Sequence, residues 1–518
     1  MQHSRIFIND SIHHIIDKNL SGIRVTYSGL ISLIGGLITV LTAIIFTLIL
    51  TRTLATNEYG TWGLINGLLY YVLLIGPITS YWTTREIARG LESGTTAILS
   101  SGMLSIIGVI AYVIIAYAMG HQANIDQTTL FSASMLIPFI FIYGALNAIN
   151  LGSKPQSVSY GSIFLGLAQI LMGLVFVILL NMGVKGVILT LTVSYMICDV
   201  VLFIYARNKI RKKFDKDLLR KWIRFFWIPL YPSLTIVVAK LDIVIFTIMT
   251  GSVVGLAFWT AAMTLPSTIS NAGLMSRAVY SKLLERDTRE YVQDNITHLF
   301  YFIIPFTFIS ITFARPALFA LNPNYAIAFP VAIFLAIYMF FNVLSNVFMS
   351  FLTGIEKVDT NQKSTFRDYI KSKLFFVPTL RLVQYAIYVI LLVIGLSILM
   401  RFATQLVLLT YWSVVILVTE IPITIYLYTL VRKNFSLKMN SRSISKYFIA
   451  GIVAYGITYL LTEHLLHFQK NIFEFLPILL LFIVFGTIVY LLITYIIDRR
   501  TRTLFKEVIR EIKNKMSN

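Results

Sequence analysis

Long hydrophobic segments recur along the whole chain and are separated by short polar stretches. Each is close to the ~20 residues that an α-helix needs to cross the hydrocarbon core of a bilayer. The pattern predicts fourteen membrane-spanning helices, at about 25–50, 61–82, 97–119, 130–150, 161–181, 184–206, 225–250, 254–275, 298–314, 327–353, 381–398, 404–430, 447–465 and 476–497. We therefore expect an all-α, polytopic integral membrane protein.

The segment 1–24 has a different pattern. Isoleucine and leucine recur at helical spacing between Ile8 and Ile23, with His13 and Asp17 on the opposite side. An amphipathic helix of this kind lies on the membrane surface. The first long apolar run begins only at Val25 and is a full span, so we expect no cleavable signal peptide.

Composition restricts the class of protein further. With 57% hydrophobic and 13% charged residues, a soluble domain of 518 residues is excluded. The single cysteine, Cys198, lies in an apolar run and excludes disulfides and cysteine-based metal sites. No predicted outside loop exceeds about a dozen residues, and the longest inside loop lacks a phosphate-binding glycine motif. We expect no catalytic residues, metal or cofactor.

The distribution of positive charge predicts the orientation. A cytoplasmic N-terminus places 37 of the 43 Lys and Arg residues in the tails and the even-numbered loops, with nine in 207–224 and seven in the tail 498–518. The others are Arg52, Lys185, Arg315, Arg401 and Lys470 on the outer side and Lys240 within a span. We predict an N-in/C-in protein of the cytoplasmic membrane. Contact with anionic lipid headgroups explains the net charge of +20 without a nucleic-acid partner.

Two charges interrupt the span at 225–250. Lys240 and Asp242 lie near its middle, where each costs about 2.5 to 3.5 kcal/mol on insertion-derived scales. Positions two apart on a helix point to nearly opposite sides, so we expect that the two charges cannot simply neutralise each other. A partner on another helix, such as Glu420 or Asp199, or an anionic ligand would then compensate Lys240.

Two further acids are isolated in apolar helices. Asp199 lies toward the cytoplasmic end of the span 184–206, and Glu420 is central in 404–430. With Asp242, these residues are candidates for coupling to a sodium ion or a proton. Exposure to solvent is the alternative for Asp199.

Small polar residues recur on one face of two spans. The first stripe begins with Arg24 at the cytoplasmic end and continues through Ser28, Ser32, Gly35, Thr39 and Thr42. The second consists of Thr260, Thr264, Ser267 and Asn271. Such residues either allow close packing between helices or form the wall of a hydrophilic cavity. The pattern leaves both alternatives open.

Several short motifs resemble a known family. The segments ILTRTLATNEYGTWGLINGLL (49–69) and GPITSYWTTREIARG (76–90) are similar to motifs of polysaccharide-biosynthesis flippases in the multidrug/oligosaccharidyl-lipid/polysaccharide exporter superfamily. AKLDIVIFTIMTGSVVGLAFWTAAMTL (239–265), RPALFALNPNYAIAFPVAIF (315–334) and FLTGIEK (351–357) resemble later segments of the family. The similarity covers about 20–355. Arg52, Glu58, Tyr59 and Gly60 occupy motif positions, Gly60 as a turn residue.

The resemblance implies an architecture. Two six-helix lobes would surround a central cavity, with two further helices appended and no enzymatic domain. The implied organisation is an amphipathic segment 1–24, an N-lobe 25–206, a basic linker 207–224, a C-lobe 225–430 with a basic insert 355–380, appended helices 431–497 and a basic tail 498–518.

The resemblance also implies a function. The substrate would be a polyprenyl-phosphate- or pyrophosphate-linked glycan, flipped across the membrane by alternating access among membrane lipids. Its phosphate would bind Lys240, Arg24, Arg52 or Arg85, and a sodium ion or proton would drive the cycle. A cation-coupled small-molecule or multidrug exporter of the same superfamily is the alternative. An integral-membrane glycosyltransferase or polymer ligase is disfavoured by the short loops.

Overall fold

The structure is a computed structural model that describes residues 35–36, 38–123, 125–210, 213–276, 289–356, 366–435, 440–503 and 506. Arg24, Ser28 and Ser32 lie outside the described residues, as does the predicted surface helix 1–24. Parts of the insert 355–380 and of the tail 498–518 lie outside them as well.

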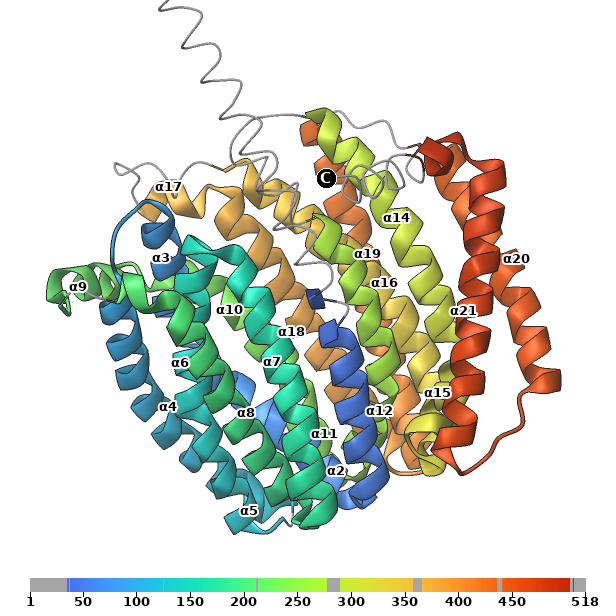
Figure 1. The fold of residues 1–518 in the computed structure, drawn as a ribbon, viewed down its shortest axis with the longest axis horizontal. Coiled ribbons are helices and arrows are strands. Elements are labelled where there is room, and N and C mark those ends of the chain that lie inside the picture. Colours follow the sequence, from blue (N-terminus) through green and yellow to red (C-terminus); the bar gives the residue numbers. More distant parts are fainter. Residues whose placement is uncertain are drawn as a thin grey trace, which may run out of the picture. The chain divides into compact units, whose positions relative to one another are not determined.

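All regular elements of the described residues are helices, as the hydrophobic pattern predicts (Figure 1). The α-helices after Ile38–Thr53 are α2 (Thr56–Leu73), α3 (Pro77–Ala88), α4 (Gly94–Ala123), α5 (Gln127–Ser132), α6 (Leu136–Ser153), α7 (Pro155–Gly173), α8 (Gly183–Ala206), α9 (Lys216–Arg224), α10 (Trp227–Ala239), α11 (Leu241–Thr250), α12 (Val254–Ser267), α14 (Arg289–Thr312), α15 (Ala314–Leu321), α16 (Phe329–Gly354), α17 (Phe366–Ile370), α18 (Lys373–Leu399), α19 (Gln405–Phe435), α20 (Ser441–Leu465) and α21 (Ile472–Ile497). Short 3-10 or π segments join several of them: η1 (Ala133–Met135), η2 (Leu174–Leu179), η3 (Arg207–Lys209), η4 (Thr268–Ser276) and η5 (Pro323–Ala328).

The chain is a multi-pass membrane protein. Within the described ranges, eleven helices are long and apolar enough to cross a membrane, and the pair α2 and α3, bent by 61°, could supply a twelfth span. The predicted count of fourteen is not confirmed. The predicted span 25–50 corresponds to the shorter apolar helix Ile38–Thr53, and 254–275 corresponds to α12, which has only 14 residues before it continues as η4.

The chain divides into two compact units. Unit 1 comprises Met1–Leu54 and Leu68–Ser233, and unit 2 comprises Ala55–Gly67 and Leu234–Asn518. In unit 1, α6 packs against α3, α4 and α8, and α7 packs against α8. In unit 2, α16 packs against α19, α14 packs against α20, and α20 packs against α21.

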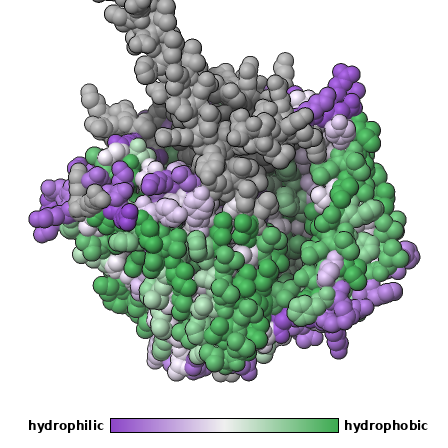
Figure 2. Space-filling model, in the orientation of Figure 1, coloured by the Kyte–Doolittle hydropathy of each residue, from purple (hydrophilic) through white to green (hydrophobic). Residues whose placement is uncertain are grey.

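Each unit has an apolar interior. A core cluster in unit 1 surrounds the fully buried Trp222 of α9, and a large cluster in unit 2 includes Tyr447, Tyr455 and Tyr490. Large apolar side chains also cover outward faces, such as Ile110 and Ile114 of α4, which are 58% and 64% exposed. Figure 2 shows such hydrophobic surface along the helices and hydrophilic residues at helix ends. An exposed apolar face is what a lipid-facing helix requires.

Two positions require glycine for different reasons. Gly251 ends α11 with φ 61°, in the left-handed region that glycine adopts without strain. Gly60 lies inside α2 and not in a turn, contrary to the expectation for the motif. A Cβ atom at Gly60 would lie 2.0 Å from the carbonyl oxygen of Val253, so α2 approaches the start of α12 too closely for any side chain.

Candidate functional site

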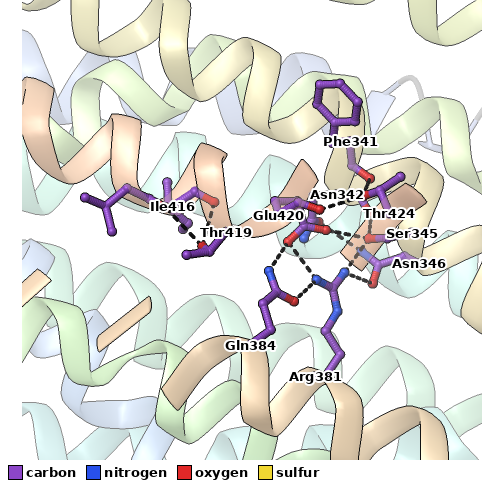
Figure 3. Close-up of polar contacts among 11 residues, drawn as sticks. Phe341, Asn342, Ser345, Asn346, Arg381, Gln384, Ile416, Thr419, Glu420 and Thr424 are labelled. Carbon is purple, nitrogen blue, oxygen red and sulfur yellow. Dashed lines mark hydrogen bonds and ion pairs between the residues drawn. The ribbon is translucent and has the colours of Figure 1, made fainter. Parts of the chain in front are cut away.

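A buried ion pair lies in the interior of unit 2. Arg381 of α18 places Nη1 2.6 Å from Oε2 of Glu420 on α19, and the two side chains are 4% and 0% exposed. Figure 3 shows Arg381 and Gln384 extending from α18 toward Glu420. The pair removes two charges from contact with water, and such a pair is stable only when further hydrogen bonds satisfy both groups.

Neighbouring polar groups supply those hydrogen bonds. Ser345 Oγ of α16 donates to Glu420 Oε1 at 2.6 Å, and Gln384 Nε2 donates to Oε2 at 2.7 Å. Arg381 also donates to Gln384 Oε1 at 2.6 Å, to Ser345 Oγ, and to Asn346 Oδ1 at 3.5 Å. Both oxygens of Glu420 therefore accept hydrogen bonds, and three helices are held together at this point (Figure 3).

Asp242 forms a second buried network in unit 2. Its Oδ2 accepts a hydrogen bond from the Tyr388 hydroxyl at 2.8 Å, and its Oδ1 accepts one from the backbone amide of Ile243 at 2.7 Å. The hydroxyl of Tyr388 in turn accepts a hydrogen bond from Trp412 Nε1 at 2.6 Å. Trp412 stacks on Trp259 with ring centroids 3.8 Å apart. These hydrogen bonds and the ring stack hold the carboxylate of Asp242 in one position.

One face of α18 connects the two networks. Arg381, Gln384, Tyr385 and Tyr388 follow each other at spacings of three, one and three residues, which places them along one side of the helix. The guanidinium carbon of Arg381 lies 5.6 Å from the centre of the Tyr385 ring. Unit 2 therefore contains a polar layer that extends from Glu420 to Asp242.

Lys240 lies where the helix of its span is interrupted. α10 ends at Ala239 and α11 begins at Leu241, so Lys240 is in neither helix. The expectation that Lys240 and Asp242 cannot neutralise each other stays a prediction. Glu420, one predicted partner for Lys240, is bound to Arg381 instead.

Asp199, the other predicted partner, lies in unit 1. Asp199 is 8% exposed, and neither carboxylate oxygen has a hydrogen-bond partner among the described residues. The alternative that it is solvated is therefore wrong. Tyr143 of α6 and Tyr195 of α8 lie close to it.

The structure describes two of the predicted basic residues of unit 1, Arg85 and Arg52. The guanidinium of Arg85 lies 4.4 Å above the ring of Tyr81. Its neighbour Glu86 is 3% exposed and accepts a hydrogen bond from Trp222 Nε1 at 3.2 Å, which fastens α9 to α3. Arg52 is half-buried at the end of the helix Ile38–Thr53.

The described part of the first polar stripe packs against α7. A Cβ at Gly35 would lie 2.9 Å from Ser159 Cβ, and one at Gly166 would lie 2.1 Å from Thr42 Oγ1. Thr39 donates to the Gly35 carbonyl and Thr42 to the Thr39 carbonyl, at 2.8 and 3.0 Å. These contacts favour the packing alternative for this part.

The second stripe also forms hydrogen bonds within its own segment. Thr264 donates to the Thr260 carbonyl, Ser267 to the Thr264 carbonyl and Asn271 to the Thr268 carbonyl, at 3.1, 2.7 and 3.0 Å. Ser267 is exposed, and Thr260, Thr264 and Asn271 are half-buried. The cavity alternative stays a prediction for this stripe.

Sequence reasoning missed the arginine of the buried pair. Arg381 stands at the first position of the predicted span 381–398, beside a basic loop, and was counted with the cytoplasmic charges. The helix α18 actually begins eight residues earlier, at Lys373, which places Arg381 two turns inside the helix. The spacing from Arg381 to Tyr388 along one helix face is the signal that could have identified it.

Comparison with solved structures shows the fold. The lipid II flippase MurJ in an inward closed conformation matches with a TM-score of 0.61 and 15% identity, over 93% of this chain and 100% of that one. A MATE transporter in the straight conformation matches with a TM-score of 0.56 and 14% identity, over 80% and 96%. An inward-facing multidrug resistance MATE transporter of the MOP superfamily matches with a TM-score of 0.53 and 15% identity, over 76% and 95%. No protein-family model and no curated protein sequence matches this chain.

Proposed function

We propose that this protein flips a lipid-linked oligosaccharide or polysaccharide precursor across the cytoplasmic membrane by alternating access. One observation carries the proposal: the flippase structure covers 93% of this chain, whereas the two exporter structures cover 80% and 76% of it. Those exporters are themselves matched over 96% and 95% of their length. The exporter fold thus leaves a part of this chain unmatched, and the flippase fold leaves much less.

The chemistry of Lys240 supports an anionic substrate. A polyprenyl-phosphate- or pyrophosphate-linked glycan carries its negative charge next to the lipid, at the point that must cross the membrane. Lys240 is half-buried at the interruption between α10 and α11, and the acid Glu420 is bound to Arg381. We propose Lys240 as the phosphate contact in unit 2, with Arg24, Arg52 and Arg85 as further candidates.

Substrate-induced stabilisation tests this role of Lys240. The purified protein is titrated in detergent with a short polyprenyl-pyrophosphate-linked glycan, and its melting temperature is measured. We expect stabilisation of the wild type, loss of that shift in Lys240→Ala and partial retention in Lys240→Arg, because arginine keeps the charge. Lys185→Ala is the matched control, since Lys185 is 50% exposed and lies outside the polar layer of unit 2.

Melting temperatures with and without substrate distinguish binding of the substrate phosphate by Lys240 from a role of Lys240 in the stability of the fold. Loss of the substrate-induced shift with an unchanged melting temperature of the unliganded protein supports the proposal. An equal shift in Lys240→Ala and the wild type would remove Lys240 from the substrate site.

A cation-coupled small-molecule exporter is the second candidate, because the MATE structures share the fold. Vesicles that contain the purified protein should accumulate a lipophilic cation such as ethidium under an ion gradient if this candidate is correct. The flippase proposal expects no accumulation above that of empty vesicles.

A further inference from the structure

The described part of the basic segment 207–224 belongs to unit 1. Its first half is fastened to α4. Thr95 Oγ1 donates to the Ile210 carbonyl at 2.9 Å, and the backbone amide of Asp215 donates to Thr96 Oγ1 at 2.9 Å. The predicted linker therefore has a fixed position on this unit.

One side of α9, the helix in this segment, is buried against unit 1. Trp222 is fully buried and donates from Nε1 to Glu86 Oε2 of α3 at 3.2 Å. Lys221 Nζ lies 3.6 Å from the other carboxylate oxygen of Glu86. Leu218 and Leu219 pack against the core cluster that contains Trp222. The opposite side of α9 therefore faces the surroundings of the protein.

That opposite side carries a stripe of positive charge. Lys216, Arg220 and Arg224 recur at a spacing of four residues, which places them along one face of the helix. All three residues are exposed. Asp217 is also exposed and lies in the first turn, where a negative charge favours the helix dipole. The three basic residues outnumber this acid, so the face has a net positive charge.

Exposed apolar side chains lie beside this basic stripe. Ile223, near the end of α9, is 56% exposed, and Phe226, just after the helix, is 42% exposed. Basic residues next to exposed apolar residues are typical of helices that lie in a membrane interface, with the cations at the headgroups and the apolar groups in the acyl region. A nucleic acid or an acidic protein would require only the charges.

The position of α9 is also that of an interfacial helix. It lies across the ends of α3 and α4 and extends outward beyond them (Figure 1). Leu99 and Met103, near the same end of α4, are 47% and 55% exposed. Figure 2 shows hydrophilic residues at this edge of the hydrophobic surface. The basic stripe therefore lies where the apolar surface of unit 1 ends, at the level of the lipid headgroups.

We infer that α9 is a binding site for anionic phospholipids in the leaflet on its side of the membrane. The lipid phosphates contact Lys216, Arg220 and Arg224, and Ile223 and Phe226 lie among the adjoining parts of the acyl chains. Each basic residue near an anionic membrane surface adds to the attraction. The inference goes beyond the proposed function, because it concerns the lipids around the protein and holds whatever the protein transports.

Bound lipid should also stabilise unit 1. α9 is joined to α3 through Glu86, and the residue before it, Asp215, is joined to α4 through Thr96. Headgroups that hold α9 at the membrane surface therefore also hold the ends of these two helices. The stability of the protein should then depend on the charge of the lipids.

The first experiment measures which lipids surround α9. Ile223→Cys is labelled with a fluorophore, since the native Cys198 is buried. The labelled protein is reconstituted in phosphatidylcholine that contains either brominated phosphatidylglycerol or brominated phosphatidylcholine at equal mole fraction, and quenching by bromine reports contact. We expect severalfold stronger quenching by the anionic lipid, and a smaller difference at high salt, because salt screens exposed charges.

Variants that remove charge identify the residues that bind the lipid. In the triple variant Lys216→Gln, Arg220→Gln and Arg224→Gln, the two brominated lipids should quench equally. Arg432→Gln with Lys433→Gln is the matched control, since both residues are exposed and lie in the last turn of α19 in unit 2. This control should retain the preference for the anionic lipid.

Three results of the quenching experiment would overturn the inference. Equal quenching of the wild type by both lipids would show that α9 does not select anionic headgroups. An unchanged preference in the triple variant would place the selection in other residues. Absence of quenching by either lipid would show that α9 lies away from the bilayer and would favour a soluble acidic partner instead.

Thermal unfolding provides the control for folding. The triple variant changes only exposed residues, so we expect its melting temperature in a neutral detergent to equal that of the wild type. Phosphatidylglycerol added to the micelles should raise the melting temperature of the wild type and not that of the triple variant. An equal rise in both proteins would contradict the inference.

A soluble phosphate distinguishes a lipid site from a site for free phosphate. Glycerol 3-phosphate should not raise the melting temperature of the wild type, because it has no acyl chains to contact Ile223 and Phe226. A rise as large as that caused by phosphatidylglycerol would overturn the assignment to lipid.

Discussion

Arg381 and Glu420 place opposite charges in the interior of unit 2, at 4% and 0% exposure. Their hydrogen bonds to Gln384 and Ser345 satisfy both groups at once. Removing one member of such a pair leaves an uncompensated buried charge, whereas replacing both by apolar residues is often neutral. The pair and its hydrogen bonds therefore join α16, α18 and α19 at this point.

Arg381→Ala is expected to destabilise the protein by roughly 3 to 5 kcal/mol, because Glu420 would be left charged and buried. Thermal unfolding in detergent measures the change. Arg401→Ala is the matched control, because Arg401 is exposed. The double variant Arg381→Met with Glu420→Leu should recover most of the loss. A single variant as stable as the Arg401 control would contradict this account of the pair.

The carboxylate of Asp126 should make the stability of the protein depend on pH. It caps α5 and accepts hydrogen bonds from the hydroxyls and amides of Thr128 and Thr129, which lower the pKa of Asp126 to about 2. Since the folded pKa lies below the unfolded value of about 3.9, the carboxylate stabilises the fold at higher pH, and this contribution disappears as the pH falls toward 2. The difference in melting temperature between wild type and Asp126→Ala should shrink from pH 5 to pH 2. A constant difference would show that the cap does not depend on the charge.

The sequence identified the buried acids but not their partners. Asp199, Asp242 and Glu420 stand out because acids are rare in apolar segments. Which of them is compensated depends on residues from other helices, such as Arg381 and Tyr388, and no local pattern contains that information. Lys240 shows the same limit, since only the structure reveals that its helix is interrupted.

At the scale of elements, two helices can approach closely where a glycine leaves out the Cβ atom of a side chain. Gly60 of α2 meets the Val253 carbonyl, whereas Gly102 of α4 has no atom within 4 Å of its ideal Cβ. Both glycines lie inside helices, where alanine is favoured over glycine by roughly 0.5 to 1 kcal/mol. The two positions therefore isolate the effect of the contact.

Gly60→Ala should destabilise the protein by about 1 to 3 kcal/mol, because the methyl group would overlap a carbonyl oxygen. Gly102→Ala should be neutral or slightly stabilising. Melting temperatures of the two variants provide the comparison, and equal effects would contradict the close approach of α2 to the start of α12.

Helix positions were more predictable than helix shape. The hydrophobic pattern located the long spans because each must match the bilayer, as for α4 and α21. It did not reveal the bend of 61° between α2 and α3, which falls at Gly76 and Pro77 inside the predicted span 61–82. Apolar residues on both sides of such a bend conceal it from a hydropathy pattern.

At the scale of the whole molecule, the orientation in the membrane follows from the charge distribution. Gln127 lies in a predicted outer loop and Asp217 in the basic inner segment, on α9. An impermeant thiol reagent applied to intact cells should label Gln127→Cys and not Asp217→Cys. The native Cys198 is buried and should not react. The reverse labelling would overturn the N-in/C-in prediction.

The most direct test of the proposed function is the movement of substrate across a bilayer. Purified protein is reconstituted with a fluorescent polyprenyl-pyrophosphate-linked glycan, and a membrane-impermeant quencher reports the fraction in the outer leaflet over time. We predict that the inner-leaflet pool becomes accessible with the wild type and much more slowly with Lys240→Ala. Wild-type vesicles in which that pool stays as protected as in protein-free vesicles would contradict the proposal that this protein is a lipid-linked glycan flippase.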